Sequence, residues 1–558
     1  MVAIEQAQRW ALFDPDPVTR GQIDALIDAG DPKLIRLFTG RIAFGTAGLR
    51  AAVGPGPNRM NALVVRQTTA ATIEWLKRNG VERPLMVIGF DARPDSLPFA
   101  RHAAAAALAC GATIQRADMG VPTPVVAHAL LGEGADAGVV ITASHNPPAD
   151  NGYKLYLGDG LQIVSPIDSE IAALIDELAQ TWSTHGVVVD DAFADLDGTE
   201  VQPAQHWVTA HRQAAVQALF TANRDISIAY TAMHGVGGQP IVDAFVQAGF
   251  TAPELVAEQF EPDGSFPTVG FPNPEEPGAF DMALAKAAAV DADAAFANDP
   301  DADRLAIAVR SRDGVGYTPL SGNQLGALLA DHVLRHSSGA GERVVARSVV
   351  SSRLLDAMAQ LAGVSCEVTL TGFKWVARPI ITRAPARYLF GFEEAIGYCV
   401  GDRVRDKDGV TAALAAAEAL ATLKMQGLTV WDRLDELATT HGVHLDQPVT
   451  VRFDDEPHRV HELMQRIAAD PPVELAGVAV QDSGPVGLGS LPHTPGLHLL
   501  LADDTQVIIR PSGTEPKLKA YVEVIEPVTD ANALARAQAT ARDRLVAVVR
   551  AVSDLLAS

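Results

Sequence analysis

A serine in a short polar segment is the first residue that could do chemistry. Residues 141–156 read Ile-Thr-Ala-Ser-His-Asn-Pro-Pro-Ala-Asp-Asn-Gly-Tyr-Lys-Leu-Tyr, and the apolar run Ala137–Ile141 ends just before Ser144. This order predicts a loop after a buried strand, which is where α/β proteins place reactive groups. Most loop serines only cap turns or helices. Ser144 gains interest because three distant segments carry groups that phosphoryl transfer to and from a serine would need.

Three aspartates follow a second predicted strand. The segment Asn-Asp-Pro-Asp-Ala-Asp-Arg comes directly after the apolar run Ala294–Ala297, so Asp299, Asp301 and Asp303 occupy alternate positions. Alternate carboxylates can converge on one hard cation such as Mg²⁺. A calcium loop of the EF-hand type is not expected, because this chain has arginines where that loop needs glycine and glutamate. Taken alone, the segment fits a solvated acidic turn equally well.

Two glutamates form the third segment, again at a predicted strand end. Gly-Phe-Glu-Glu-Ala-Ile-Gly-Tyr places Glu393 and Glu394 between glycines. Paired carboxylates can accept hydrogen bonds from neighbouring sugar hydroxyls. On this segment alone, two exposed glutamates that begin a helix are the better interpretation. The same region contains further polar loop residues, namely Thr371, Gly372, Lys374 and Lys407.

The fourth segment is a compact candidate for anion binding. Arg-Pro-Ser-Gly-Thr-Glu-Pro-Lys follows the predicted strand Gln506–Ile509. An arginine, two hydroxyls, a glycine that exposes backbone N–H groups, and a lysine suit a phosphate group. We favour this function over a plain turn. The residues concerned are Arg510, Ser512, Gly513, Thr514 and Lys517.

Four further residues could assist at the serine. Arg50 ends the glycine-spaced loop Phe-Gly-Thr-Ala-Gly-Leu-Arg, and His145 and Lys154 flank Ser144. In isolation His145 is more simply a structural histidine, but beside a nucleophilic serine it becomes a candidate for proton transfer. Arg304, next to the aspartates, could steady the same phosphoryl group.

Competing motifs fail. Residues 234–240, His-Gly-Val-Gly-Gly-Gln-Pro, have proline where a dinucleotide-binding loop needs its third glycine. The chain has no Gly-Lys dipeptide, so it has no P-loop. Ser144 lacks the flanking glycines of a hydrolase nucleophile elbow.

Short Val/Ile runs alternate with Ala-rich stretches, which predicts an α/β fold of several domains. Three consecutive α/β domains of similar size, followed by a smaller α+β domain, are expected at residues 1–205, 206–320, 321–445 and 446–558. The first domain includes a helical N-terminal extension over residues 3–38. The expected strands are Leu85–Phe90, Thr113–Ala117, Ala137–Ile141, Ile226–Thr231, Glu254–Glu258, Ala294–Ala297, Leu305–Val309, Val344–Val350, Glu367–Leu370 and Tyr388–Gly391, and the expected helices include Gln324–Leu334 and residues 529–556.

Composition excludes several classes of function. The chain has 558 residues and a formal net charge of −24, which argues against a nucleic-acid partner. Its three widely spaced cysteines form neither a disulfide framework nor a zinc motif. We see no signal peptide and no apolar run of membrane-spanning length, so no membrane partner is expected. A cytoplasmic enzyme fits these observations.

The four segments, in this order, resemble the α-D-phosphohexomutase family over about residues 40–550. The resemblance implies three related α/β domains with mixed sheets and a smaller C-terminal domain around a central active-site cleft. Ser144 matches the family's phosphoserine, which also contributes to the metal site. Asp299, Asp301 and Asp303 match its Mg²⁺ ligands. The segments with Glu393 and Glu394 and with Arg510 to Lys517 match its sugar-recognition and phosphate-binding loops, and the residues matched around the transferred phosphoryl group are Arg50, His145, Lys154 and Arg304.

The resemblance implies a mutase that interconverts hexose 1-phosphate and hexose 6-phosphate, with glucose or mannose as the sugar. A trace of glucose 1,6-bisphosphate or a related bisphosphosugar would act as activator, and we expect a monomer or homodimer. Ala395 stands where many family members have a serine, and this resembles a longer-chain subgroup. The alternatives are therefore a phosphopentomutase, a glucose 1,6-bisphosphate synthase or, from another class, a non-catalytic phosphosugar-binding protein.

Overall fold

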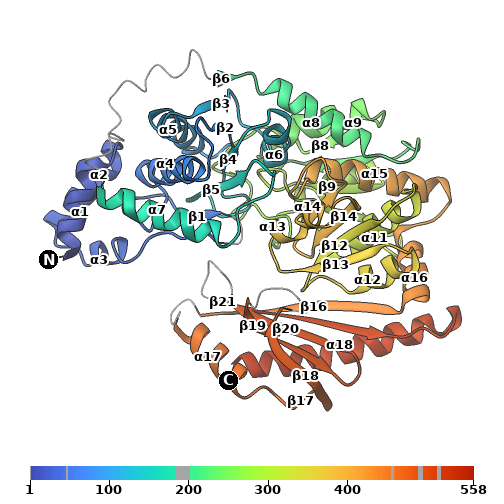
Figure 1. The fold of residues 1–558 in the computed structure, drawn as a ribbon. Coiled ribbons are helices and arrows are strands. Elements are labelled where there is room, and N and C mark those ends of the chain that lie inside the picture. The colour runs from blue at the N-terminus through green and yellow to red at the C-terminus, as the bar shows by residue number, and fades with distance from the viewer. Residues whose placement is uncertain are drawn as a thin grey trace. The chain divides into compact units, whose positions relative to one another are not determined.

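The chain forms two compact units in the computed structural model, which describes residues 2–45, 48–181, 201–453, 458–487, 494–511 and 517–557 (Figure 1). The first unit comprises Met1–Leu219, Arg224–Leu320 and Gly397–Glu418. The second comprises Phe220–Asn223, Ser321–Ile396 and Ala419–Ser558.

The first unit begins with a helical extension and a six-stranded mixed sheet. The strand order is β1-β5-β4-β2-β3-β6, in which β2 runs parallel to β3 and β4 while β5 runs antiparallel to β4 and β1. All five residues of β4 are buried, as expected for an apolar strand between two neighbours. The elements are α1 (Val2–Phe13), α2 (Pro17–Asp28), α3 (Lys33–Leu37), β1 (Leu49–Ala52), α4 (Ala62–Arg78), β2 (Leu85–Phe90), α5 (Ser96–Ala109), β3 (Thr113–Ala117), α6 (Thr123–Gly132), β4 (Ala137–Ile141), β5 (Asp150–Leu157), α7 (Ile167–Thr181) and β6 (Val201–Gln202).

A second mixed sheet of the same unit carries the aspartate segment. Its order is β11-β10-β9-β7-β8, with β7 parallel to β8 and β9, and β10 antiparallel to β9 and β11. The turn between β9 and β10 therefore leaves the sheet at the carboxyl end of a buried strand. The elements are α8 (Gln205–Gln217), β7 (Ile228–Thr231), α9 (Gly238–Gln247), β8 (Glu254–Leu255), α10 (Asp281–Val290), β9 (Ala294–Ala297), β10 (Ala306–Arg310) and β11 (Tyr317–Pro319). Outside this sheet, the later segment Gly397–Glu418 of the first unit contains β15 (Gly397–Val400) and the beginning of α15 (Gly409–Met425).

The second unit contains a parallel array of strands in which β12 pairs with β13 and β14. Helix α11 begins with a capping box, in which Ser321 and Gln324 satisfy each other's backbone N–H groups. The elements are α11 (Gly322–His336), β12 (Arg343–Ser348), α12 (Leu354–Leu361), β13 (Ser365–Thr369), α13 (Phe373–Val376), α14 (Pro379–Thr382), β14 (Arg387–Glu393), the part of α15 that follows Glu418, and α16 (Val430–His441).

An antiparallel sheet in the order β16-β21-β20-β19-β18-β17 completes the second unit. Helix α18 packs on β16 and β21 through buried residues spaced three or four apart, from Ala537 to Leu556. The elements are β16 (Val443–Arg452), α17 (His458–Ala469), β17 (Glu474–Leu475), β18 (Val478–Val486), β19 (Thr494–Leu501), β20 (Gln506–Pro511), β21 (Lys517–Glu526) and α18 (Leu534–Ala557).

The expected α/β class with mixed sheets is confirmed, and the differences lie at the ends of elements. Strand β8 stops at Leu255 because only two of its residues pair with β7, and a 3₁₀ turn follows at Ala257–Gln259. Strand β12 stops at Ser348 rather than at residue 350. The last helix begins at Leu534 after a 3₁₀ turn. Among the described helices, none has the length and apolar character needed to cross a membrane.

Candidate functional site

Ser144 lies on the loop between β4 and β5 in a strained backbone conformation. Its φ is 53°, in the left-handed region that non-glycine residues rarely occupy. Its backbone N–H donates to the Thr142 hydroxyl at 2.8 Å. The side chain is fully buried. Strain of this kind persists only where the surroundings hold it, and it concentrates at functional sites.

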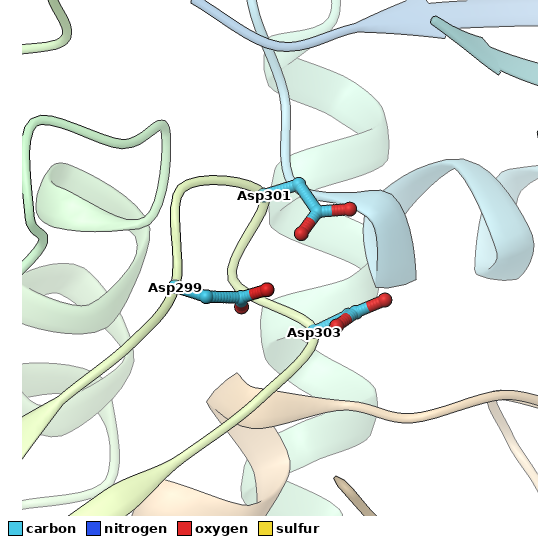
Figure 2. A group of neighbouring side chains, drawn as sticks. All are labelled: Asp299, Asp301 and Asp303. Carbon is cyan, nitrogen blue, oxygen red and sulfur yellow. The ribbon is translucent and has the colours of Figure 1, made fainter. Parts of the chain in front are cut away.

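Asp299, Asp301 and Asp303 meet on the turn between β9 and β10. Figure 2 shows their carboxylates turned to the same side of this turn, and all three side chains are fully buried. Ser144 Oγ donates to Asp299 Oδ2 at 2.7 Å, so the structure brings together the first two segments that the sequence singled out. Burial and the charges of Asp301 and Asp303 raise the pKa of Asp299 well above its usual value.

The aspartate turn is held by close packing as well as hydrogen bonds. Asn298 donates from Nδ2 to the Arg304 carbonyl oxygen at 2.5 Å, and Arg304 N–H donates to Asp299 Oδ1 at 3.0 Å. A Cβ on Gly409 would lie 2.5 Å from the Arg304 oxygen, and one on Gly235 would lie 2.4 Å from the Pro300 oxygen. Two glycines are thus required for neighbouring segments to approach this turn.

Two lysines neutralise the aspartates. The Lys154 ammonium, on β5, is fully buried and lies 2.6 Å from both Asp301 Oδ2 and Asp303 Oδ2. Lys407 Nζ lies 3.1 Å from Asp303 Oδ2. Burial alone would raise the pKa of Asp303, but Lys154 and Lys407, with Arg304, hold it well below its usual range. Lys407, which the sequence grouped with the sugar loop, therefore lies beside the aspartates.

The same carboxylates fit a divalent cation. They lie close enough for one oxygen from each to reach a single ion, and no other group of acidic, histidine or cysteine side chains in the described residues does so. Asp301 Oδ1 and Asp303 Oδ1 are buried without a hydrogen-bond partner. Since a buried unpaired carboxylate oxygen is costly, and oxygen ligands suit Mg²⁺, these residues could hold that ion.

His145 lies beside the serine hydroxyl, and two arginines lie near enough to His145 to affect its pKa. His145 Nδ1 lies 3.1 Å from Ser144 Oγ. Burial, followed by the charges of Arg304 and Arg50, lowers the pKa of His145 well below its usual value, so its imidazole is neutral at pH 7. Arg50 Nη1 lies 3.5 Å from Asn146 Oδ1, and Arg50 Nε is buried without a hydrogen-bond partner. Arg304 Nε lies 3.9 Å from Asp299 Oδ2, the oxygen to which Ser144 Oγ donates.

In the second unit, the glutamate pair is fixed by neighbouring loops. Glu393 Oε1 accepts from the Gly372 N–H at 2.6 Å, and Gly372 has a φ of 112° that favours glycine. Glu394 Oε2 accepts from the hydroxyls of Ser351 at 3.1 Å and Ser348 at 3.3 Å. Two of the predicted polar loops therefore come together at Glu393, and the backbone of Gly372 rather than the side chain of Thr371 makes the contact.

The predicted phosphate-binding segment joins two adjacent strands. Arg510 is the last residue but one of β20, Lys517 begins β21, and Arg510 pairs across these strands with Lys519. Two like charges opposite each other are unfavourable unless an anion lies near them. The predicted Ser512, Gly513 and Thr514 lie outside the described residues. Lys374 lies on the short helix α13 and is half-buried.

The sequence did not single out two residues that orient the site. Thr123, the first residue of α6, donates from Oγ1 to Asp301 Oδ2 at 2.6 Å, and Lys154 Nζ donates to this hydroxyl at 3.2 Å. Asp406 accepts from the Tyr156 hydroxyl at 2.6 Å and lies 3.4 Å from Lys407 Nζ. A threonine beside proline at a helix start signals only a cap, and nothing local distinguishes Asp406 from other acidic loop residues.

Four domain descriptions match the chain in order. Phosphoglucomutase/phosphomannomutase alpha/beta/alpha domain I matches residues 41–182, domain II matches 206–314, domain III matches 321–440, and the C-terminal domain matches 459–541. The matches include the serine, aspartate, glutamate and phosphate-loop segments.

The chain is also similar to individual proteins over most of its length. It is 39% identical to the Haemophilus influenzae protein named probable phosphomannomutase over 474 residues, which cover 83% of this chain and 93% of that protein. It is 34% identical to the Homo sapiens phosphopentomutase over 565 residues, which cover 94% and 91%. The crystal structure of a phosphoglucomutase/phosphomannomutase family protein from Burkholderia thailandensis shares the fold, with a TM-score of 0.63 and 22% identity over 91% of this chain and 97% of that one.

Proposed function

The chain belongs to the phosphoglucomutase/phosphomannomutase family of phosphosugar mutases, and from this premise we propose that it interconverts hexose 1-phosphate and hexose 6-phosphate. Glucose and mannose phosphates are the proposed substrates, and a bisphosphorylated sugar is the proposed intermediate and activator. The observation that carries the proposal is the position of Ser144 Oγ, 2.7 Å from Asp299 Oδ2 and 3.1 Å from His145 Nδ1. This hydroxyl has an acid–base partner and an adjoining candidate cation site, as a phosphoryl carrier requires.

In the proposed reaction, the phosphoryl group leaves Ser144 Oγ and bonds to a hydroxyl oxygen of the sugar monophosphate. The sugar hydroxyl loses its proton as its oxygen bonds to phosphorus, and His145, 3.1 Å from Ser144 Oγ, would pass a proton to the departing serine oxygen. In the second half of the reaction the serine hydroxyl attacks the other phosphoryl group, and the proton would move back through His145 to the departing sugar oxygen. Arg50 and Arg304 offset the negative charge of the group in transit. Burial of Ser144 keeps bulk water from the phosphoserine, which would otherwise hydrolyse.

Asp299, Asp301 and Asp303 would hold Mg²⁺ together with the serine oxygen. When bound, this ion would supply electrostatic stabilisation for the transferring phosphoryl oxygens. Lys154 fixes the positions of two of these carboxylates. Lys407 adds a second positive charge beside Asp303.

We assign sugar and phosphate recognition to the second unit. Glu393 and Glu394 would accept hydrogen bonds from sugar hydroxyls that the two orientations of the intermediate share. Thr371, Gly372 and Lys374 belong to the same set. Arg510 and Lys517, with Ser512, Gly513 and Thr514, would bind whichever phosphate is not reacting.

A second candidate is a phosphopentomutase or a glucose 1,6-bisphosphate synthase. The similarity to the human phosphopentomutase, which extends over 94% of this chain, supports this alternative. Ala395 removes one hydroxyl from the sugar loop, while Ser348 and Ser351 bring two hydroxyls to Glu394. The reaction chemistry at Ser144 would be the same in a phosphopentomutase.

An assay with excess Mg²⁺ and a trace of glucose 1,6-bisphosphate tests the proposal. Glucose 1-phosphate, mannose 1-phosphate and ribose 1-phosphate are offered in parallel, and we expect fast conversion of a hexose phosphate to its 6-phosphate. Preference for ribose 1-phosphate would assign a phosphopentomutase. Net synthesis of bisphosphate from a separate phosphoryl donor would assign a synthase, and steady release of inorganic phosphate would contradict a mutase.

The serine itself is tested by substitution. We expect Ser144→Ala to abolish turnover and to remove the label that a radioactive phosphosugar leaves on the wild-type enzyme. Ser169→Ala, an exposed serine on α7, is the matched control and should keep both properties. Full turnover in the Ser144 variant would refute the phosphoserine mechanism.

A further inference from the structure

Arg93 is a buried arginine that lies beneath the serine loop. It follows β2 in the segment Asp91-Ala92-Arg93, where both charged side chains are almost inaccessible to solvent. Their carboxylate and guanidinium form an ion pair at 3.2 Å. A buried pair is costly unless further hydrogen bonds satisfy its remaining atoms, so the partners of Arg93 indicate its purpose.

Those partners are four backbone carbonyls of one loop. Nη2 of Arg93 donates to the carbonyl oxygens of Ser144 at 2.8 Å and Asn146 at 2.6 Å. Nη1 donates to those of Pro147 at 2.7 Å and Asp150 at 2.8 Å. With Nε on Asp91, every guanidinium N–H is used. The rigid planar fork of arginine can serve four acceptors at once, which a lysine ammonium with three N–H groups cannot do.

Asp91 holds the other side of the same serine. Its Oδ2 accepts from the Thr142 hydroxyl at 2.6 Å, and the Thr142 oxygen accepts from the Ser144 N–H at 2.8 Å. Its Oδ1 accepts from the Ser96 hydroxyl at 2.6 Å, at the start of α5. The Asp91–Arg93 pair therefore reaches both the N–H and the C=O of Ser144, and these two groups flank its strained φ of 53°.

The second sheet region of the same unit closes over Arg93. The Phe266 ring lies 5.1 Å from the guanidinium carbon. A Cβ on Gly264 would come within 2.4 Å of the Arg93 Cα, so that turn rests directly on the arginine backbone. Water is kept from the four carbonyl bonds, which makes each one stronger and its loss more costly.

We propose that Arg93 is a positioning residue for phosphoryl transfer, which keeps the Ser144 loop in its strained conformation while the serine gains and loses a phosphoryl group. This inference rests on the proposed function. Arg93 makes no hydrogen bond to the three aspartates of the candidate cation site, to His145 or to the serine hydroxyl. It therefore affects the site only by holding the loop backbone, with Asp91 as its ion-pair partner. Without it, the strained φ relaxes, and the serine oxygen moves away from Asp299 and His145.

The test uses the full-length enzyme with Arg93→Lys, which keeps the charge but lacks the fork. We expect kcat to fall by about 100-fold, the loss associated with a misplacement of about 1 Å. KM should change by less than about threefold, since substrate binding does not involve the guanidinium. Arg83→Lys, an exposed arginine before β2, is the matched control and should behave as wild type.

A second readout does not depend on catalysis. Amide hydrogen exchange over residues 143–152, followed by mass spectrometry, should accelerate in Arg93→Lys while α18 exchanges as in wild type. Thr142→Val, which removes only the hydroxyl between Asp91 and the Ser144 N–H, should give a smaller loss in the same direction. It also keeps the proposal testable where Arg93→Lys does not fold.

The outcomes separate this inference from the proposed function. Wild-type exchange in the loop together with a kcat within about threefold of wild type in Arg93→Lys would overturn the positioning role, whatever the substrate is. Faster exchange in the loop, combined with turnover in Ser144→Ala, would refute the phosphoserine mechanism and leave the structural role of Arg93 intact.

Discussion

Substitution of Lys154 tests how the negative charges of Asp301 and Asp303 are neutralised. Its ammonium, fully buried, lies 2.6 Å from oxygens of both Asp301 and Asp303 and 3.2 Å from the Thr123 hydroxyl. Lys154→Met keeps most of the side-chain volume and removes the charge. Asp303 retains Lys407 at 3.1 Å, so Asp301 loses its charged partner.

The magnitude follows from the cost of breaking a buried ion pair. Removing one partner of such a pair costs about 3–5 kcal/mol, because it leaves an uncompensated charge. We therefore expect the free energy of unfolding to fall by about that amount when EDTA is present. A cation that binds only the folded state at 100 times its dissociation constant restores about 2.7 kcal/mol. Loss of the ammonium beside the carboxylates should also lower the dissociation constant for a cation. At the same Mg²⁺ concentration, Mg²⁺ should therefore stabilise Lys154→Met more than it stabilises the wild type.

Urea unfolding followed by circular dichroism, in EDTA and in excess Mg²⁺, measures both effects. Lys286→Met is the matched control. Lys286 forms a partly exposed pair with Glu254 at 3.4 Å, so its loss should cost less than about 1 kcal/mol. If the two variants unfold at the same urea concentration in EDTA, Lys154 does not neutralise the site. If Mg²⁺ stabilises wild type and Lys154→Met equally, the cation does not bind at these carboxylates.

Three further outcomes are expected. Gly409→Ala places a Cβ 2.5 Å from the Arg304 carbonyl oxygen. Turnover should therefore fall by about 100-fold, and the affinity for Mg²⁺, measured by calorimetry, should weaken. Gly21→Ala is the control, because nothing lies within 4 Å of the added Cβ, and it should leave turnover and Mg²⁺ affinity unchanged. Burial raises the pKa of Asp446 from 3.8 to about 6, so ionisation of this carboxyl destabilises the folded state increasingly from about pH 4 and to the full extent above about pH 6. Asp446→Asn should therefore raise the free energy of unfolding by about 3 kcal/mol at pH 8 and about half as much at pH 5, and equal gains at the two values would contradict this. Glu393→Gln should raise KM by about 10-fold without changing Mg²⁺ affinity, and an unchanged KM would remove Glu393 from substrate binding.

The sequence alone identified the chemical groups because the signals for them are local. Apolar runs such as Ala137–Ile141 and Ala294–Ala297 predict buried strands, and the polar residues after each run must lie at a strand end. Ser144 and the three aspartates were found in this way, and the structure places the Ser144 hydroxyl on Asp299 at 2.7 Å. The roles of these residues in catalysis stay predictions until the experiments above are done.

The sequence predicted strands less well where the pairing with neighbouring strands determines whether a strand forms and where it ends. Strand β5 was not predicted from the sequence, although it supplies Lys154. Its extended form is fixed by antiparallel partners on both sides, β4 and β1. Strand β8 was predicted too long, because its end depends on how far β7 accompanies it. Strand propensity depends on such partners more than helix propensity does.

Only the tertiary structure decided which charges neutralise one another. Lys154 meets Asp301 and Asp303 across 147 and 149 residues of sequence, and Tyr156 donates to Asp406 across 250 residues. The hydrogen bond from Arg93 to the Ser144 carbonyl oxygen is likewise a long-range contact that the sequence does not reveal. The electrostatic free energy of a buried charge depends on the charged and polar groups that the fold places within a few ångströms of it. Sequence spacing therefore determined what chemistry this protein can do, and long-range packing determined which side chains hold that chemistry in place.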